Sequence, residues 1–395
     1  MKILFCNFEY PPLGGGGGIS NALLAEELAQ RHKVTVLTSQ YMDMPYREYK
    51  NGVEIIRVPV PFRTQLAVAN PLSMVGYMRA GIRVGKKLLA ISKYDVINTH
   101  FVLPTGPVGD ALARFSGTPN VLSLHGGDLY DPSKLTSPHR HPILRWWVRR
   151  MLKKAAVVVG QSTNTIENMH RFYNSEIRAL KIPLGIRRPI LEPVSRKKYG
   201  FDDKDILLVT VGRLVSRKAI EQLIAMMGTF ERKRVCLLII GAGPKEAFLR
   251  HEAEKYGVSD CVRFMGYVEE AEKFNIINMC DIFVSTTQHE GFGLMFIEAM
   301  ACGLPVVCYD RGGHRDFLIN DVTGFVVPVN AREEFKNGIQ RLVVDSALRK
   351  RMGAENLRRV EEYFIDRCAQ RYEAAFEEAL WNSMNRFHHP VPIMA

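Results

Sequence analysis

The sequence of 395 residues lacks the features that mark secreted, membrane-spanning and metal-binding chains. Its seven cysteines are scattered and include no C-x-x-C pair. This pattern is typical of buried thiols in a reducing compartment and not of a disulfide framework. No apolar run approaches the ~18 residues that a spanning helix needs, and the N-terminal apolar stretch is interrupted too soon for a signal peptide. We therefore expect a soluble, cytoplasmic protein.

The sequence also lacks an RNP motif, a zinc finger and a basic zipper, so we expect no nucleic-acid partner. Its positive charge is unevenly distributed: residues 1–190 contain 25 Lys and Arg against 12 Asp and Glu, whereas residues 191–395 contain 28 against 29. This asymmetry favours an anionic partner for the N-terminal half, such as a membrane surface or a lipid-diphosphate acceptor. The alternative is that the excess charge only keeps the protein soluble.

Short, continuously apolar runs, such as residues 206–211 and 235–240, alternate with longer helical stretches along the chain. Continuous apolarity is expected of parallel strands that are covered on both faces. The alternation therefore predicts an α/β fold with two doubly wound units. The Pro-rich, basic segment 183–200 is the predicted linker. We expect an N-terminal domain over residues 1–188, a second domain over 189–370 and a C-terminal helical segment over 371–395.

A run of five glycines, residues 14–18, lies between the first predicted strand and a helix expected to begin near Asn21. Glycines allow positive φ and a close approach of backbone N–H groups to a ligand, and a helix N-terminus attracts anions. The run is neither a dinucleotide-binding G-x-G-x-x-G nor a Walker A motif. A ligand-binding loop is favoured over a purely structural turn, which rarely uses five glycines.

An H-G-G-D motif, which contains His125, Gly126 and Asp128, directly follows another predicted strand. It places a titratable ring and a carboxylate on a loop between a strand and a helix, a common position for binding and catalytic residues. A structural histidine at a turn is the alternative.

Two charged motifs follow predicted strands of the second half. Arg213 and Lys218 lie near a predicted helix N-terminus, where cations oppose the helix dipole and a bound diphosphate would explain their presence. Surface charges at a helix start are the alternative.

Glu290 on a loop and Glu298 in the following helix are eight residues apart. Such a carboxylate pair suits hydroxyl-rich ligands such as ribose and hexose.

Taken in order, these motifs resemble family 4 of the retaining GT-B glycosyltransferases. The resemblance runs from the glycine loop and H-G-G-D through V-G-R-L-x-x-x-K, F-M-G-Y-V and H-E-G-F-G-L-x-x-x-E-A-M-A-C-G-L-P-V-V to T-G-F-V-V-P. It implies two Rossmann-like domains facing each other across a cleft, with the C-terminal helix returning to the N-terminal domain. It also implies transfer of a hexose-type sugar from a UDP- or GDP-sugar to a glycan or lipid-linked acceptor, in cell-surface polysaccharide or glycolipid biosynthesis.

The resemblance assigns roles to individual residues. Four form the implied catalytic group: Arg213, Lys218, Glu290 and His125. In this group, Arg213 and Lys218 would neutralise the leaving diphosphate and Glu290 would contact the transferred sugar. The implied donor-binding residues are Gly16, Gly17, Tyr267, Val268, Phe292, Gly293, Leu294 and Glu298. Glu298 would bind the ribose hydroxyls. Gly126 and Asp128 are candidates for contact with the acceptor or the sugar.

We expect no cofactor and no metal ion, because Arg213 and Lys218 would replace Mg²⁺ at the leaving group. The chain departs from the family pattern at residues 183–187 and at Asp316, which stands in place of the usual glutamate. Two other functions remain open from sequence: a non-catalytic nucleotide-sugar-binding protein and a nucleotide-sugar epimerase of the same architecture. Turnover would separate them from a transferase.

Residues 141–154 form a predicted basic amphipathic helix with two tryptophans. Such a helix can lie in a membrane interface, and residues 71–89 are a second candidate. Together with the basic N-terminal half, they suggest peripheral association with the cytoplasmic face of the inner membrane. The alternative is that the apolar stripe of the helix packs on the sheet and its basic face is only solvated.

Overall fold

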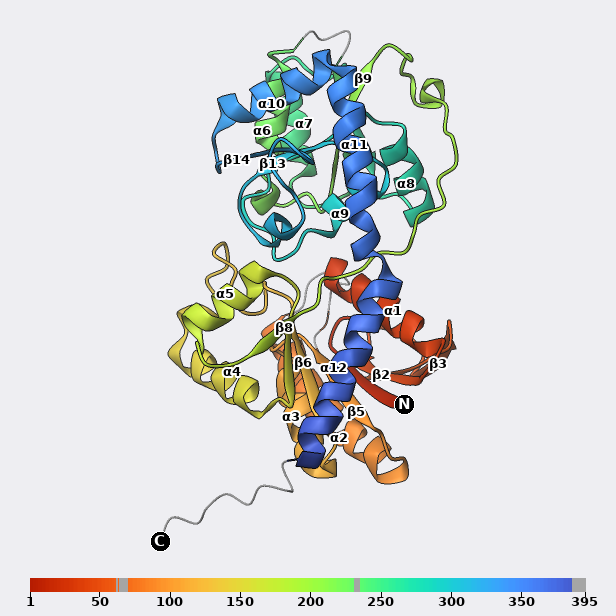
Figure 1. The fold of residues 1–395 in the computed structure, drawn as a ribbon, viewed down its shortest axis with the longest axis vertical. Coiled ribbons are helices and arrows are strands. Elements are labelled where there is room, and N and C mark those ends of the chain that lie inside the picture. The colour runs from red at the N-terminus through yellow and green to blue at the C-terminus, as the bar shows by residue number, and fades with distance from the viewer. Residues whose placement is uncertain (62, 64–69, 231–234, 386–395) are drawn as a thin grey trace. The chain divides into compact units, whose positions relative to one another are not determined.

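The computed structural model describes residues 1–61, 63, 70–230 and 235–385, which fall into two structural units (Figure 1). One unit comprises Met1–Gly185 together with Ile365–Ala395, and the other comprises Ile186–Phe364. The sequence prediction places the corresponding boundaries after residues 188 and 370. The second boundary differs because the last helix of the described chain, α12, already begins at Ile365.

The N-terminal unit is built on an eight-stranded sheet. Its strands are β1 (Lys2–Asn7), β2 (Lys33–Ser39), β3 (Arg47–Lys50), β4 (Val53–Val58), β5 (Val96–His100), β6 (Asn120–Leu124), β7 (Val157–Gly160) and β8 (Ala179–Lys181). Their order in the sheet is β3-β4-β2-β1-β5-β6-β7-β8. Neighbours pair in parallel except β3, which is antiparallel to β4.

Helices cover both faces of this sheet. They are α1 (Gly16–Ala29), α2 (Pro71–Ile91), α3 (Gly106–Ser116), α4 (Pro142–Lys154), α5 (Thr163–Phe172) and α12 (Ile365–Asn385). Successive residues of β1 point to opposite faces: Ile3 packs in a cluster with α1 and α12, whereas Leu4 packs in another cluster with α2 and α3. Helix α12 buries a stripe at helical spacing that includes Cys368, Tyr372 and Phe376.

The second unit is built on a six-stranded parallel sheet. Its strands are β9 (Ile206–Val211), β10 (Val235–Ile240), β11 (Val262–Gly266), β12 (Ile282–Ser285), β13 (Val306–Tyr309) and β14 (Gly324–Val327). The helices are α6 (Ile220–Met227), α7 (Glu246–Lys255), α8 (Glu270–Asn278), α9 (Leu294–Ala301), α10 (Arg332–Val344) and α11 (Ser346–Val360). The strand order is β11-β10-β9-β12-β13-β14.

Each sheet has a point where the direction of winding reverses. In the first unit the chain winds outward from β1 through β2 and β4 and then returns to the other side of β1 at β5. In the second unit the same reversal separates β9 from β12. Open α/β sheets bind ligands beyond the carboxyl ends of the strands at such a reversal. The glycine loop follows β1, and the loops with Lys218 and Glu290 follow β9 and β12.

The structure confirms the predicted α/β class with two doubly wound units, and the runs 206–211 and 235–240 form β9 and β10. The expected start of the first helix near Asn21 is wrong: α1 begins at Gly16 and includes three glycines. The helix extends backward because its buried face, with Ala22, Leu24 and Leu28, anchors it to the sheet. Packing thus outweighs the low helix propensity of glycine.

Among the described residues, no helix combines the length and the apolar composition needed to cross a membrane.

Candidate active site

The loop after β9 carries Lys218 back toward its own starting point. The loop leaves the sheet at Gly212, whose φ of 150° favours glycine. A Cβ on Gly212 would lie 3.0 Å from Lys218 Cε and 3.1 Å from Lys218 Nζ. A short 3₁₀ turn, Ser216–Lys218, and Ala219 in the left-handed region (φ 49°) then lead into α6. The glycine thus makes room for the lysine side chain.

Lys218 meets the loop after β12 at Glu290. Lys218 Nζ lies 2.6 Å from Glu290 Oε1, and Arg217 Nη1 lies 2.8 Å from the same oxygen. The Thr287 hydroxyl donates a third hydrogen bond to this oxygen, at 3.1 Å. Lys218 Nζ also contacts Met295 Sδ at 2.9 Å. Two of the four residues implied to be catalytic, Lys218 and Glu290, are therefore in direct contact.

Burial and charge act against each other in this cluster. Burial tends to raise the pKa of Glu290, but the charges of Lys218 and Arg217 and their hydrogen bonds hold that pKa down to about 2. Burial lowers the pKa of Lys218, and the adjacent Glu290 carboxylate opposes this shift. Glu290 is therefore a fully ionised carboxylate whose charge is already shared by two cations.

Glycines position Glu290 and the helix that follows it. Gly312 has a φ of 135°, and a Cβ there would lie 2.1 Å from the carbonyl oxygen of Glu290. The N–H of Gly313 donates to that same carbonyl at 2.9 Å. Gly293 has a φ of 95° and precedes α9, whose N-terminus has no side-chain cap. The backbone at Phe292, Gly293 and Leu294, predicted to bind the donor, thus forms the entry to α9.

Glu298 lies within α9 and is held by a lysine from a different helix. Lys273 Nζ of α8 lies 2.8 Å from Glu298 Oε1, and both side chains are mostly buried. The ion pair therefore fixes the position of Glu298, the residue predicted to bind the ribose hydroxyls. Phe292 is also buried, and its ring contacts those of Phe317 and Tyr363, so any ligand contact it makes comes from its backbone.

The remaining predicted site residues of the second unit, one from the catalytic group and two from the donor-binding group, lie on loops. Arg213 follows Gly212 and is exposed. Tyr267 and Val268 form the loop between β11 and α8, where Tyr267 is exposed and Val268 is half-buried. Their predicted roles therefore stay predictions, and they require a ligand that reaches the surface of these loops.

In the N-terminal unit, the glycine loop and the H-G-G-D motif meet. A Cβ on Gly17 would lie 2.8 Å from Phe101 Cζ and 3.7 Å from His125 Nδ1. The ring of Phe101 stacks on that of His125, with centroids 4.2 Å apart. Gly16 and Gly17 are the first two residues of α1, whose N-terminus has no side-chain cap. The predicted residues Gly16, Gly17 and His125 are therefore brought together.

Asp128 orders the loop that carries His125. Its Oδ1 accepts from the backbone N–H of His125 at 2.9 Å, and its Oδ2 accepts from that of Val102 at 2.7 Å. Burial raises the pKa of Asp128 to about 6, although these backbone hydrogen bonds oppose the shift. Gly126 turns the loop with a φ of 76°. Asp128 thus serves the backbone, and its predicted contact with a substrate is not needed to explain its position.

Sequence reasoning missed three residues of these clusters: Arg217, Lys273 and His100. Arg217 directly precedes Lys218 in the sequence, and the motif assigned a binding role to Lys218 alone. Lys273 is on a helix remote in sequence from Glu298, and no local pattern links them. His100 ends β5, with Nδ1 3.1 Å from His125 Nε2. Its position at the carboxyl end of a strand, beside the winding reversal, was the one available signal.

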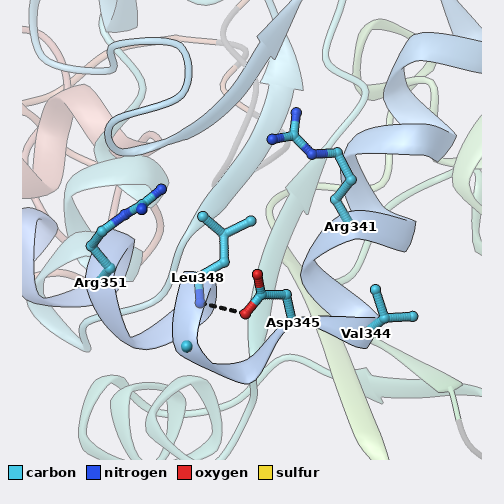
Figure 2. A pocket seen from close by; sticks show the side chains of 6 residues that line it. Arg341, Val344, Asp345, Leu348 and Arg351 are labelled. Atoms are coloured by element: carbon cyan, nitrogen blue, oxygen red, sulfur yellow. Dashed lines mark hydrogen bonds between the residues drawn. The ribbon is translucent and has the colours of Figure 1, made fainter.

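A hollow elsewhere in the second unit is unrelated to these clusters. It lies where α10 turns into α11, and Arg341, Asp345 and Arg351 are among its lining residues (Figure 2). The Asp345 side chain accepts from the backbone N–H of Leu348 at 2.8 Å and thereby caps α11. None of the residues that line this hollow is a predicted site residue.

The described residues contain no cluster of three or more His, Cys, Asp or Glu side chains that could hold a metal ion. An Asp-x-Asp sequence is present at residues 203–205, so the expectation of no metal ion cannot rest on the absence of this pattern. It directly precedes β9. It therefore lies at the amino end of this strand, opposite to the end where the loop with Lys218 begins.

The basic helix predicted over 141–154 is α4. Its apolar stripe packs inward, since Val148, Met151 and Leu152 are buried in a cluster with β6 and β7. Trp146 remains 62% exposed and Ile143 79% exposed. Trp146, Arg149, Arg150, Lys153 and Lys154 are among the residues that line a groove along this helix. The apolar stripe thus belongs to the core, and this basic surface of α4 stays accessible within its unit.

Comparison with known proteins agrees with this architecture. Residues 14–187 match the family described as Glycosyltransferase Family 4, and residues 192–359 match Glycosyl transferases group 1. An uncharacterised glycosyltransferase of Methanocaldococcus jannaschii is 30% identical over 367 residues, which cover 89% of this chain and 91% of that protein.

Two solved structures share the fold. Sucrose-phosphate synthase from Thermosynechococcus elongatus superposes with a TM-score of 0.83 at 24% identity, covering 96% of this chain and 98% of that one. The Anabaena protein HepE, in complex with UDP-glucose, gives a TM-score of 0.74 at 18% identity, covering 95% and 99%. With two Rossmann-like units and both family regions in order, this chain belongs to the family 4 type of GT-B glycosyltransferases and is a glycosyltransferase.

Proposed function

We propose that this glycosyltransferase moves a hexose-type sugar from a nucleotide-diphosphate sugar, UDP- or GDP-linked, to a glycan or lipid-linked acceptor, with retention of configuration and without a metal ion. The observation that carries the proposal is the contact of Lys218 and Arg217 with Glu290. This contact brings together cations that can bind a diphosphate and a carboxylate that can bind sugar hydroxyls. They lie beyond the carboxyl ends of two adjacent strands, β9 and β12.

The charge of this cluster suits a diphosphate. Two cations and one carboxylate leave one excess positive charge in this cluster. An ammonium group has three N–H donors. Lys218 directs two of them at Glu290 and Met295, which leaves the third for a phosphate oxygen. The proposed cleavage develops negative charge on the departing diphosphate, and preorganised cations stabilise that charge.

The geometry around Glu290 favours a binding role over a nucleophilic one. Both cations contact Glu290 Oε1, and its pKa is about 2. A carboxylate that is neutralised this fully is a weak nucleophile, although it can still accept hydrogen bonds from sugar hydroxyls. We therefore propose that the acceptor attacks from the side of the leaving group and that a donor phosphate oxygen takes its proton, unlike the carboxylate mechanism of retaining glycosidases.

The nucleotide part of the proposal has separate support. Glu298 is a mostly buried carboxylate held in place by Lys273, and carboxylates pair well with the two adjacent hydroxyls of a ribose. The structural relative HepE was crystallised with UDP, with UDP and glucose, and with UDP-glucose. We therefore place UDP-sugars first among the donors to be tested.

The acceptor side of the proposal rests on the basic surface of α4. Trp146 is exposed and lines a groove with Arg149, Arg150, Lys153 and Lys154, and Ile143 of the same helix is also exposed. An exposed tryptophan beside clustered cations suits the interface of an anionic bilayer. A lipid-linked acceptor would be reached from such a position. We infer peripheral membrane association for a role in polysaccharide or glycolipid assembly.

The donor proposal is tested by nucleotide release from a panel of UDP-, GDP- and ADP-sugars in the presence of EDTA. Wild type should release nucleotide from one donor class, and Glu290→Ala should lower the rate by at least about a hundredfold. A rate that EDTA abolishes and Mg²⁺ restores would refute metal independence. The anomeric configuration of the product, measured by NMR, tests retention, and an inverted product would refute it.

The membrane proposal is tested by flotation with phosphatidylglycerol vesicles at low salt. Wild type should float, whereas Lys153→Glu and Trp146→Ala should float less. Arg351→Glu, an exposed charge reversal in the second unit, is the matched control and should float like wild type. An equal loss of flotation in Arg351→Glu and Lys153→Glu would show that binding depends on the overall charge and not on the surface of α4. Failure of wild type to float would refute membrane association.

A further inference from the structure

A chain of buried polar side chains crosses the N-terminal unit from α12 to the H-G-G-D loop. Its members, in order, are Tyr372, Ser123, Asn98, His100 and His125. The successive donor–acceptor distances are 3.0, 3.4, 2.9 and 3.1 Å. The first four side chains are at most 2% exposed. Buried chains of this kind fix the position of each hydrogen atom, because an unsatisfied member is costly.

The direction of the chain follows from Asn98. Its amide oxygen accepts from Ser123 and its amide nitrogen lies at His100 Nε2. An amide nitrogen can only donate, so His100 Nε2 must be the bare nitrogen of the ring. Burial lowers the pKa of His100 well below its ordinary value and that of His125 to about 3, so both rings are neutral near pH 7.

A neutral imidazole carries one N–H. With Nε2 bare, His100 carries its hydrogen on Nδ1 and donates to His125 Nε2. His125 Nε2 is therefore an acceptor, and the single hydrogen of His125 is on Nδ1. The polarity set by Asn98 is thus passed through two rings to the end of the chain.

The Nδ1 atom of His125 ends the chain without a hydrogen-bond partner among the described residues. His125 is only 8% exposed, and a Cβ on Gly17 would lie 3.7 Å from this nitrogen. Nδ1 therefore faces the N-terminus of α1, where backbone N–H groups have no side-chain cap. The N–H group at Nδ1 and the backbone N–H groups of α1 are all hydrogen-bond donors, so an oxygen atom of a ligand would satisfy them.

We propose that His100 is a positioning residue: it fixes His125 as the Nδ1–H tautomer, so that His125 donates a neutral hydrogen bond to a hydroxyl or phosphoryl oxygen of the bound sugar substrate. The proposal deepens the proposed function and rests on it for the substrate. With the opposite tautomer, His125 would present a lone pair to that oxygen and repel it.

The tautomer is measured directly by long-range ¹H–¹⁵N NMR on the full-length chain labelled with ¹⁵N-histidine. The spectrum of His125→Ala assigns the His125 signals by their loss. We expect protonation at Nδ1 and a bare Nε2 in both His100 and His125. An Nε2-protonated or doubly protonated His125 at pH 7 would overturn the proposal. This measurement needs no turnover, so it remains decisive even if no sugar donor is consumed and the proposed function fails.

Variants at His100 test the consequence for activity. His100→Phe keeps the ring stacked on Phe5 but removes both nitrogens. It should mix the two tautomers of His125 and lower kcat/KM for nucleotide release about tenfold. His100→Asn restores an amide donor near the position of Nδ1 and should recover most of this loss.

Tyr372→Phe is the control at the far end of the chain. It removes one hydroxyl but leaves Asn98 and His100 in place, so the His125 signals should not change. Comparable melting temperatures for all variants show that folding is intact. If His100→Phe leaves the His125 tautomer and kcat/KM as in wild type, the positioning role is refuted. If His100→Phe fails to fold, the same comparison is made with His100→Leu and His100→Asn.

The UDP affinity of His125→Ala separates a phosphoryl contact from a hydroxyl contact. Loss of a phosphoryl contact would weaken UDP binding, whereas loss of a hydroxyl contact would not.

Discussion

Lys218 and Arg217 donate to the same oxygen of Glu290, at 2.6 and 2.8 Å. The three side chains are mostly buried, so removal of the carboxylate would leave two cations to share one site. Removal of one cation, in contrast, would leave Glu290 with the other cation and with Thr287. The cluster is therefore asymmetric in its response to substitution.

The first prediction is that Glu290→Gln destabilises the protein more than Lys218→Met. We expect Glu290→Gln to cost about 3 kcal/mol, the range found when one partner of a buried ion pair is removed. Lys218→Met should cost about 1 kcal/mol, because its methionine can pack against Met295. Denaturant midpoints followed by circular dichroism measure both. Equal losses would show that the two cations do not share the carboxylate in solution.

The sequence predicted the fold well because most strands are continuously buried. The run 235–240, for example, is apolar at every position, as expected of a strand covered on both faces, and all of β10 is buried. The strands β3 and β8 had no such signal. β3 has the sequence R-E-Y-K at the sheet edge and is largely exposed, and β8 is only three residues long.

The site was predicted only where its residues share a motif. Glu290 and Glu298 lie in one continuous pattern, and Lys218 ends another. The partners that fix these side chains, Lys273 and Arg217, are brought to them by the tertiary fold. A single sequence does not encode such pairings locally. For the same reason the hydrogen-bond role of Asp128 toward the backbone of Val102 could not be foreseen.

The second prediction concerns the ion pair between Lys273 and Glu298. If Glu298 binds the donor ribose, Glu298→Ala should weaken nucleotide binding by at least about tenfold, through the loss of two charge-assisted hydrogen bonds. Lys273→Met keeps the carboxylate but not its orientation, so its effect should be smaller, about threefold. Calorimetric titration with UDP measures both. Lys255→Met, which breaks an exposed pair on α7, should bind UDP like wild type.

The third prediction separates two neighbouring glycines. A Cβ on Gly17 would lie 2.8 Å from the Phe101 ring and would press on the stack with His125. Gly17→Ala should therefore lower the rate of nucleotide release about tenfold or more, although alanine favours the helix. A Cβ on Gly15 would meet nothing within 4 Å, and its φ is −122°. Gly15→Ala should therefore keep wild-type activity. Equal losses in the two variants would point to loop flexibility and not to the contact with Phe101.

The fourth prediction concerns the pH dependence of stability that Asp128 confers. Burial raises its folded pKa from 3.8 to about 6, against the effect of its backbone hydrogen bonds. Because the folded state binds this proton more tightly, the contribution of Asp128 to stability is fully present below about pH 4. It is lost as the pH rises toward 6. The loss should amount to about 3 kcal/mol in the wild type and should be absent in Asp128→Asn.

The free energy of unfolding of both proteins, measured at intervals between pH 4 and 7, tests this sign. The difference between Asp128→Asn and wild type should change in favour of the variant up to about pH 6 and then remain constant. Asp131→Asn is the matched control, because hydrogen bonds from Ser133 and the charge of Lys134 outweigh burial and lower the pKa of Asp131. Its contribution is lost at acid pH instead, below about pH 4. A difference for Asp128→Asn that does not vary with pH would mean that the backbone hydrogen bonds of Val102 and His125 hold Asp128 ionised throughout this range.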